Sequence, residues 1–177
     1  IDGLRKMYPQ KTFYPDANFT MRLTYGTIGD YSQGNAIMYD YTTTFDGVIE
    51  KMDNDNPEFI VSEKLVKLYK DQNFGPYANE DGELNICFIS NNDITGGNSG
   101  SPVINSRGEL IGCAFDGNWE AMSGDIAFED QLQRTISVDI RYILFIIDYY
   151  AEAKHIIDEL TLVKTSDKEM DLSLIHI

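Results

Sequence analysis

The chain has 177 residues, and its 14 Lys and Arg against 29 Asp and Glu leave a formal net charge of −15 at pH 7. This acidic surplus argues against a nucleic-acid or anionic-membrane surface, because both need clustered Lys and Arg. A hydrophobic content of 42% and an aromatic content of 12% are too high for a disordered chain, and the length fits one domain. The longest apolar run, residues 142–147, is far shorter than the ~20 residues of a membrane span.

The first half of the chain predicts two strands and two short helices. Residues 1–18 are expected to be an irregular lead-in, and alternating apolar and polar residues over 19–25 predict a strand. A turn-rich loop over 26–34 leads to a second strand at 37–42. Apolar residues at helical spacing predict helices over 45–52 and 62–71, and residues 73–83 form a predicted polar loop.

The second half is denser in strands. We expect strands over 84–90 and 134–138, with a hairpin between them made of residues 102–105 and 109–115. Loops are predicted at 91–100 and 116–125. Asp139 is expected to cap a helix that runs to about Leu160. The pattern predicts a mainly β unit with a short helical insert and a C-terminal helix.

The last residues, 164–177, are expected to form a disordered tail that packs on nothing. Their end reads Ser-Leu-Ile-His-Ile, which resembles translated adapter sequence, so a non-native origin is expected for residues 172–177. Cys87 and Cys113 lie inside apolar runs and are expected to be small buried side chains. Without CxxC spacing they predict no metal or redox site, and we expect no cofactor.

The most informative segment is residues 96–102, Gly-Gly-Asn-Ser-Gly-Ser-Pro, between two predicted strands. Glycine permits positive φ, so consecutive backbone N–H groups can point at one spot. An acyl-transfer enzyme needs such a spot beside its nucleophile. We therefore predict Ser99 as the nucleophile, with an oxyanion hole made by the N–H groups of Gly97 and Ser99.

Two enzyme architectures present a serine in this way. In the α/β-hydrolase elbow a helix follows the serine, whereas here Pro102 and a β-hairpin follow. The chymotrypsin-like double β-barrel instead places Gly-[Asp/Asn]-Ser-Gly-[Gly/Ser]-Pro between strands of its second barrel and ends in a helix. We therefore expect the second barrel of that fold, in which residues 109–119 pair with substrate and wall the specificity pocket.

Several separated segments, residues 14–23, 91–102, 115–125 and 133–142, resemble the bacterial dipeptidyl-peptidase 7 and 11 family, and the resemblance runs to about Val163. It implies a secreted, periplasmic or cell-surface serine exopeptidase that releases dipeptides from peptides with a free N-terminus, and a homodimer for the full-length enzyme. Ser99 matches the nucleophile, and Asp116 matches the acid that grips the substrate's α-ammonium. Gly117 matches the position that sorts the subfamilies and implies an apolar or broad P1 preference. Phe115 and Asn118 flank these two positions and complete the implied substrate edge.

The chain departs from that family in lacking a base before the serine. Its two histidines, His155 and His176, both follow Ser99, whereas chymotrypsin-like enzymes place His and Asp first. We expect His155 to be a helix-surface or packing residue. Residues 1–163 are therefore predicted to be the C-terminal part of a larger peptidase domain, which alone shows no turnover because serine without a base is a poor nucleophile.

Two alternative readings stay open. Asp93 lies six residues before Ser99, the spacing of the acid that selects Lys or Arg in trypsin-like enzymes, so a chymotrypsin-like endopeptidase of tryptic or glutamyl type is one alternative. The other is a binding or regulatory fragment that keeps the barrel without the chemistry. Trp119 is expected either to wall the cleft or to pack.

Overall fold

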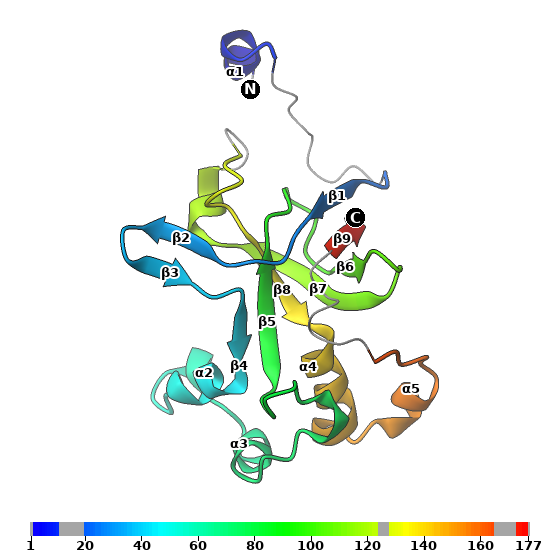
Figure 1. The fold of residues 1–177 in the computed structure, drawn as a ribbon. Helices are drawn as coiled ribbons and strands as arrows, with labels where there is room; N and C mark the ends of the chain where they lie inside the picture. The colour runs from blue at the N-terminus through cyan, green and yellow to red at the C-terminus, as the bar shows by residue number, and fades with distance from the viewer. Residues whose placement is uncertain (1, 11–19, 124–127, 165–172, 177) are drawn as a thin grey trace.

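The computed structural model describes residues 2–10, 20–123, 128–164 and 173–176. It is mainly β: one seven-stranded sheet and one two-stranded hairpin carry helices at one end (Figure 1). The strands are β1 (Leu23–Gly26), β2 (Tyr31–Gly34), β3 (Ile37–Tyr39), β4 (Thr42–Thr44), β5 (Asn85–Ser90), β6 (Ser101–Asn105), β7 (Leu110–Gly117), β8 (Thr135–Asp139) and β9 (Ser173–His176). The helices are α1 (Asp2–Met7), α2 (Phe45–Glu50), α3 (Glu63–Lys70), α4 (Ile140–Phe145) and α5 (Lys154–Asp158), with shorter segments η1 (Pro57–Phe59), η2 (Gly75–Tyr77), η3 (Trp119–Ser123) and η4 (Ile146–Tyr150).

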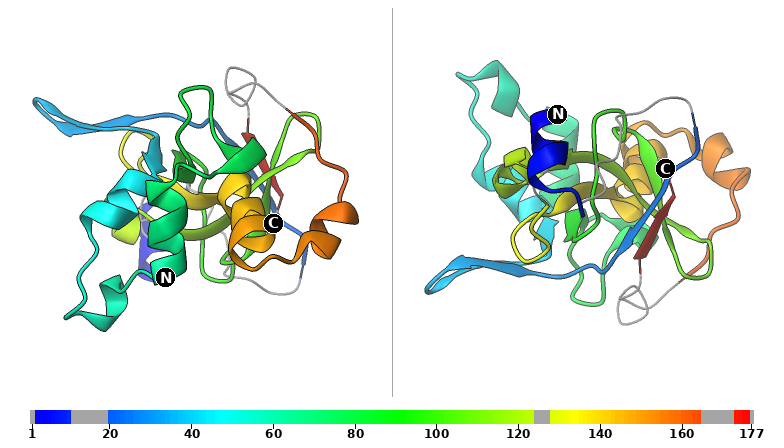
Figure 2. Two further views of the ribbon diagram at one scale, coloured as in Figure 1. Left: turned by 90° about the horizontal axis from the view of Figure 1, so that it is seen from below. Right: turned by 90° about the horizontal axis from the view of Figure 1, so that it is seen from above.

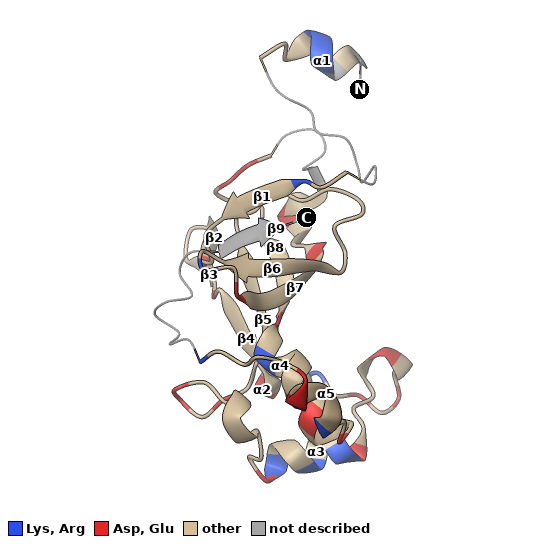
Figure 3. Cartoon of the chain, turned by 90° about the vertical axis from the view of Figure 1, so that its right-hand side faces the viewer, with Lys and Arg blue, Asp and Glu red and all other residues tan. Residues whose placement is uncertain are grey.

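The large sheet has the order β1-β9-β6-β7-β8-β5-β4, with antiparallel neighbours throughout. It curls like a barrel, because the chain just after β1 meets β5 near the other edge. Ile28 bridges Ser90, and the Gly29 N–H donates to the Ile89 carbonyl at 3.3 Å. The views along the sheet in Figure 2 and Figure 3 show the same curved arrangement. Curling matters for function because it sets β1 beside the loop that joins β5 to β6.

Buried apolar side chains gather in two clusters. Between the helices and the lower end of the sheet lies the aromatic cluster, Phe45, Phe74, Tyr77, Leu84 and Phe145. Inside the curled sheet lies a smaller one, the sheet cluster, made of Phe88, Val103, Ile111 and Ala114. Along β8 every second residue, Thr135, Ser137 and Asp139, is buried, as the two-residue period of a strand requires.

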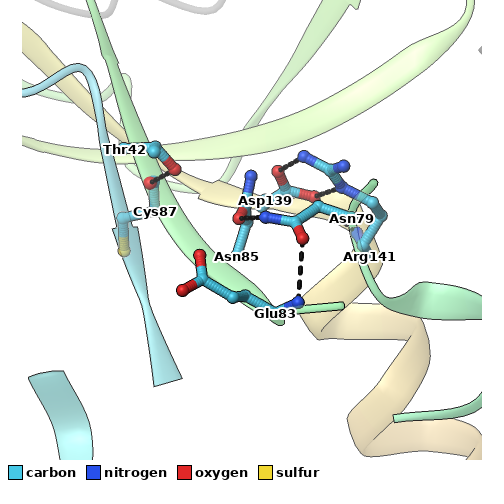
Figure 4. A network of polar contacts seen from close by, with 7 residues as sticks. All are labelled: Thr42, Asn79, Glu83, Asn85, Cys87, Asp139 and Arg141. Carbon is cyan, nitrogen blue, oxygen red and sulfur yellow. Dashed lines mark hydrogen bonds and ion pairs between the residues drawn. The ribbon is translucent and has the colours of Figure 1, made fainter. Parts of the chain in front are cut away.

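Local sequence signals account for the helix starts. The Ser62 hydroxyl accepts from the Leu65 N–H at the start of α3, and the Asp139 carboxylate accepts from the Arg141 N–H at the start of α4. Asp139 is 1% exposed, and the guanidinium of Arg141 pairs with both of its oxygens at 3.0 and 2.8 Å (Figure 4). Pairing and hydrogen bonding offset part of the cost of burying this carboxylate. Asp139 is both the last residue of β8 and the N-cap of α4.

A second polar group lies beside that pair. Asn79 donates to the Asn85 side chain at 3.0 Å and accepts from the Glu83 N–H at 2.8 Å, which closes the turn before β5 (Figure 4). Figure 3 shows few charged residues on the sheet strands, whereas α3 carries Lys64, Lys67 and Lys70.

Several expectations about elements need correction. Residues 2–7, expected to be irregular, form α1, and the predicted 26–34 loop contains β2, which pairs with β3. The helix expected from Asp139 to about Leu160 breaks after η4, because Glu152 has a left-handed φ of 56°, and it resumes only as α5. The hairpin 102–105 and 109–115, the 84–90 strand and the 134–138 strand are confirmed within two residues at each end.

The tail expected to pack on nothing differs as well. Residues 173–176 form β9, which lies between β1 and β6 and pairs with both. The edges of β1 and β6 present backbone N–H and C=O groups, and an extended segment of β-forming residues satisfies them. Residues 165–172 lie outside the described residues.

Candidate active site

The loop between β5 and β6 presents Ser99 to solvent. Gly97 and Gly100 have φ of 96° and 87°, which L-residues with a Cβ rarely adopt. Ser99 stands between them and is exposed, and Ser101 immediately after the loop begins β6. The two glycines therefore turn the chain tightly on either side of an accessible hydroxyl.

Asn98 braces this loop from inside. Its side chain is 4% exposed, and its Oδ1 accepts from the Thr95 N–H at 2.7 Å. Backbone bonds from Asn98 to Thr95 and from Ser101 to Asn98 close two short turns around it. Arg22, the residue before β1, donates to the Thr95 hydroxyl at 3.1 Å. The loop is therefore fixed to the sheet by side chains as well as by its ends.

The backbone donors of the loop divide into two sets. The N–H groups of Asn98, Gly100 and Ser101 all donate within the chain, Gly100 to the Ala114 carbonyl at 2.8 Å. Among the described residues, no acceptor faces the N–H of Gly97 or of Ser99. These two are the groups predicted from the sequence to form an oxyanion hole, and they are available for a ligand oxygen.

The Ser99 hydroxyl lies against the end of β7. It donates to the Phe115 carbonyl at 3.1 Å, at a point where the β7–β8 register slips between Ala114 and Asp116. Asp116 is exposed, and its Oδ1 accepts from the Gly117 N–H at 2.8 Å. The structure thus brings Ser99, Phe115 and Asp116 together at the end of β7.

Gly117 and Asn118 continue the implied substrate edge. A Cβ on Gly117 would lie 2.9 Å from the Cβ of Ala121 in η3, so the position has little room for a side chain. Asn118 uses both amide hydrogens within the chain, donating to Glu120 and to the Leu132 carbonyl at 2.8 Å each. Its Oδ1 accepts from the Arg134 N–H at 2.9 Å. Asn118 therefore shapes the edge by holding it, and direct contact of its side chain with substrate stays a prediction.

A cavity of about 490 Å³ opens behind the loop and includes Asp93 in its lining. Arg22 lines the same cavity, so the described residues of its lining include one carboxylate and one guanidinium. A pocket for Lys or Arg needs surplus negative charge, and the described lining residues carry no such surplus. Trp119 is 82% exposed, so within the described residues it does not pack into the protein.

No histidine side chain described in the structure lies near the serine loop. His155 is exposed on α5, at the helical end of the molecule, in agreement with its prediction as a surface residue (Figure 1). Both cysteines are free and half-buried, and burial raises the pKa of the Cys87 thiol.

Sequence reasoning missed the bracing residues. It assigned no role to Asn98, Arg22 or Thr95. A buried Asn beside the serine of a Gly-rich loop was a visible signal, because Asn side chains close turns by accepting backbone N–H groups. The Arg22 contact joins residues 73 apart in the chain and had no local signal.

Comparison with known proteins places the chain in a family. The model of the family described as Peptidase S46 matches residues 1–162. The Dipeptidyl-peptidase 7 of Phocaeicola vulgatus is 57% identical over 164 residues, 93% of this chain and 23% of that protein. The Asp/Glu-specific dipeptidyl-peptidase of Flavobacterium psychrophilum is 46% identical over 163 residues, 92% of this chain and 23% of that protein.

A solved structure agrees with these matches. The crystal structure of Porphyromonas endodontalis DPP11 in complex with substrate has a TM-score of 0.80 and 47% sequence identity, and the match covers 89% of this chain and 23% of that one. The chain thus spans about a quarter of the length of these relatives. In the part of the chain that the structure describes, no helix has the length and apolar character to cross a membrane.

Proposed function

Because the chain belongs to the Peptidase S46 family, we propose that it carries the nucleophile of a serine-type dipeptidyl-peptidase that removes dipeptides from peptide N-termini. The observation that carries this proposal is the arrangement at the end of β7: an exposed Ser99 hydroxyl, two backbone N–H groups without an acceptor among the described residues and the Asp116 carboxylate. Such a set supplies the attacking group, the oxyanion donors and an anchor for a cation.

The proposed chemistry is acyl transfer. In the enzyme, a histidine base outside these residues takes the Ser99 proton, and the oxygen attacks the carbonyl after the second residue of the peptide. The N–H groups of Gly97 and Ser99 hold the developing oxyanion, and water then releases the dipeptide. In the present structure the Ser99 hydroxyl donates instead to the Phe115 carbonyl, a contact it must give up for the base.

The residues at the end of β7 are proposed to determine which substrates bind. Asp116 is proposed to pair with the free α-ammonium and thereby to measure two residues to the scissile bond. Gly117, which projects no side chain, is proposed to leave the P1 pocket open to apolar or varied side chains. The named relatives include both a Dipeptidyl-peptidase 7 and an Asp/Glu-specific enzyme, and the higher identity to the former supports this choice.

The wider context is part of the same proposal. Residues 1–163 form the second barrel of a chymotrypsin-like double barrel together with its C-terminal helices. The full-length enzyme works outside the bacterial cytoplasm and can form a homodimer. Since the chain described here lacks the base, we expect the isolated chain to show no turnover.

The test uses the full-length protein that carries this chain. A fluorophosphonate probe should label Ser99, and Ser99→Ala should abolish labelling and lower turnover of a free dipeptidyl coumarin amide by at least about 10⁴-fold. Blocking the substrate's amino group, or changing Asp116→Asn, should raise KM strongly.

Other outcomes point to the alternatives. Cleavage of N-blocked substrates alone would identify an endopeptidase of tryptic or glutamyl type. Absence of labelling with intact folding would identify a non-catalytic barrel. The balanced charge of the cavity at Asp93 argues against the tryptic alternative.

A further inference from the structure

The β2–β3 hairpin projects from the body of the molecule, yet its base reaches the substrate edge proposed above (Figures 1 and 2). The connection runs through Glu120, a residue of η3 that follows Asn118 by two positions. Nothing in the sequence motif around Ser99 pointed to this residue.

Within the part of the chain that the structure describes, three side chains donate to the Glu120 carboxylate. From the hairpin, the Tyr31 hydroxyl donates to Oε2 at 3.1 Å and the Gln33 amide to Oε1 at 2.6 Å. From the substrate edge, the Asn118 amide donates to Oε2 at 2.8 Å. Because a carboxylate accepts through both oxygens, this one side chain joins two elements that belong to different sheets.

The contact with Asn118 couples the position of Glu120 to the end of β7. Asn118 holds β7 to the start of β8 through its backbone N–H and its side chain, both bonded to Arg134 at 2.9 Å. Its carbonyl also accepts from the Ala121 N–H at 2.9 Å, which sets the Ala121 methyl over Gly117. A shift of Glu120 would therefore move the backbone next to Asp116. It would also move the Ala121 methyl that lies over Gly117.

The hairpin side of the link is itself anchored. The Tyr31 ring is 8% exposed, stacks on Tyr39 at 4.9 Å between centroids and lies 5.4 Å from the Arg134 guanidinium. Arg134 also donates to the Asp30 carbonyl at 3.0 Å. Tyr31 is thus a rigid donor, and its aromatic contacts do not depend on its hydroxyl.

We propose that Glu120 is a positioning residue: its carboxylate, held by the β2–β3 hairpin, sets the strand end that carries Asp116 and Gly117 and so controls recognition of the substrate's first two residues. This proposal rests on the proposed dipeptidyl-peptidase function. It goes further in assigning specificity control to a group whose described hydrogen bonds are to Tyr31, Gln33 and Asn118 and not to Ser99.

Kinetics of the full-length protein test the proposal. Glu120→Ala should raise KM for a free dipeptidyl coumarin amide about tenfold, with kcat within about threefold, because it weakens binding rather than chemistry. Fluorophosphonate labelling of Ser99 should keep its rate, since that reaction bypasses the amino-terminal site. Glu80→Ala, an exposed carboxylate before β5 at the other end of the sheet, is the matched control and should change nothing.

The conservative variant separates positioning from folding. Glu120→Gln keeps an acceptor for Asn118, and Gln33 can flip its amide to meet the new N–H group, so KM should recover to near the unvaried value. Adding Tyr31→Phe to Glu120→Ala should raise KM no further, because both changes break one link. An unchanged KM in Glu120→Ala, or a parallel fall in labelling and turnover, would overturn the proposal.

Backbone hydrogen exchange tests the same link without catalysis. In Glu120→Ala the amides of Gly117 and Asn118 should exchange about tenfold faster, whereas those of Gly100 and Ser101 should keep their rates. If Gly117 and Asn118 exchange at the same rates in Glu120→Ala as in the unvaried protein, positioning by Glu120 is refuted. Should Ser99 of the unvaried protein fail to react with the probe, the proposed function falls, and the exchange rates still decide the positioning proposal.

Discussion

The two buried clusters of this protein differ in what surrounds them. The aromatic cluster packs ring on ring: Phe145 is 0% exposed and lies 6.2 Å from Phe45 and 6.0 Å from Phe74, centroid to centroid. Its one buried hydroxyl, on Tyr77, has a partner in Asp148 at 2.9 Å. This end of the molecule combines large buried area with satisfied polar groups, the arrangement that contributes most to stability.

The sheet interior next to the serine loop is smaller and more polar. Buried side-chain atoms of Ser90, Asn92, Asn98 and Ser137 have no hydrogen-bond partner among the described residues. Each such group costs about 1–3 kcal/mol when it stays unpaired. The comparison indicates that the helical end stabilises the fold, whereas the end that carries the site retains groups that do not favour stability.

The largest test removes a ring from the aromatic cluster. Phe145→Ala should lower the free energy of unfolding by about 3–5 kcal/mol, measured by urea denaturation. Phe88→Ala, which removes a 3% exposed ring from the sheet cluster, is the matched variant and should cost about 1–2 kcal/mol less. Equal losses would mean that the two clusters do not differ as described.

A second test addresses the serine loop. Asn98→Ala removes the acceptor of the Thr95 N–H but also an unpaired buried amide, so the expected loss of stability is only about 1 kcal/mol. Fluorophosphonate labelling of Ser99 in the full-length protein should nevertheless slow about tenfold, because the loop loses its brace. Ser106→Ala, in the exposed β6–β7 turn, serves as the control.

A third test uses pH at the aromatic cluster. Burial, with help from the Asp148 carboxylate, raises the pKa of Tyr77 above its ordinary value. Above about pH 10 the unfolded chain loses this proton while the folded protein keeps it, so stability falls by up to about 1.4 kcal/mol per pH unit. Tyr77→Phe lacks this contribution and should lose less stability between pH 9 and pH 11, as measured by urea midpoints.

The smallest effect should lie in the sheet interior. Ser137→Ala deletes a fully buried hydroxyl that has no partner in the described chain, so stability should rise by up to about 1 kcal/mol. Two positions earlier, the Thr135 hydroxyl donates to the Asn92 carbonyl at 2.9 Å, so Thr135→Val should destabilise by about 1 kcal/mol. Thermal melts compare the pair, and a loss in both would show that Ser137 has a partner after all.

The sequence alone determined what depends on near neighbours. The caps at Ser62 and Asp139, the β6–β7 hairpin and the glycine-flanked serine loop follow from residues a few positions apart, whose backbone preferences act before any tertiary contact forms. These local features also carried the resemblance to dipeptidyl-peptidases and the choice of Ser99.

Tertiary structure decided what depends on distant partners. β9 became a strand because β1 and β6 offered open edges, and the helix after Asp139 broke where Glu152 takes a left-handed conformation. Asn118 and Glu120 acquired their roles only when the curled sheet brought β2, the end of β7 and Arg134 together. A hydrogen bond between residues far apart in the chain leaves no periodic or local mark on the sequence, so only the folded arrangement shows it.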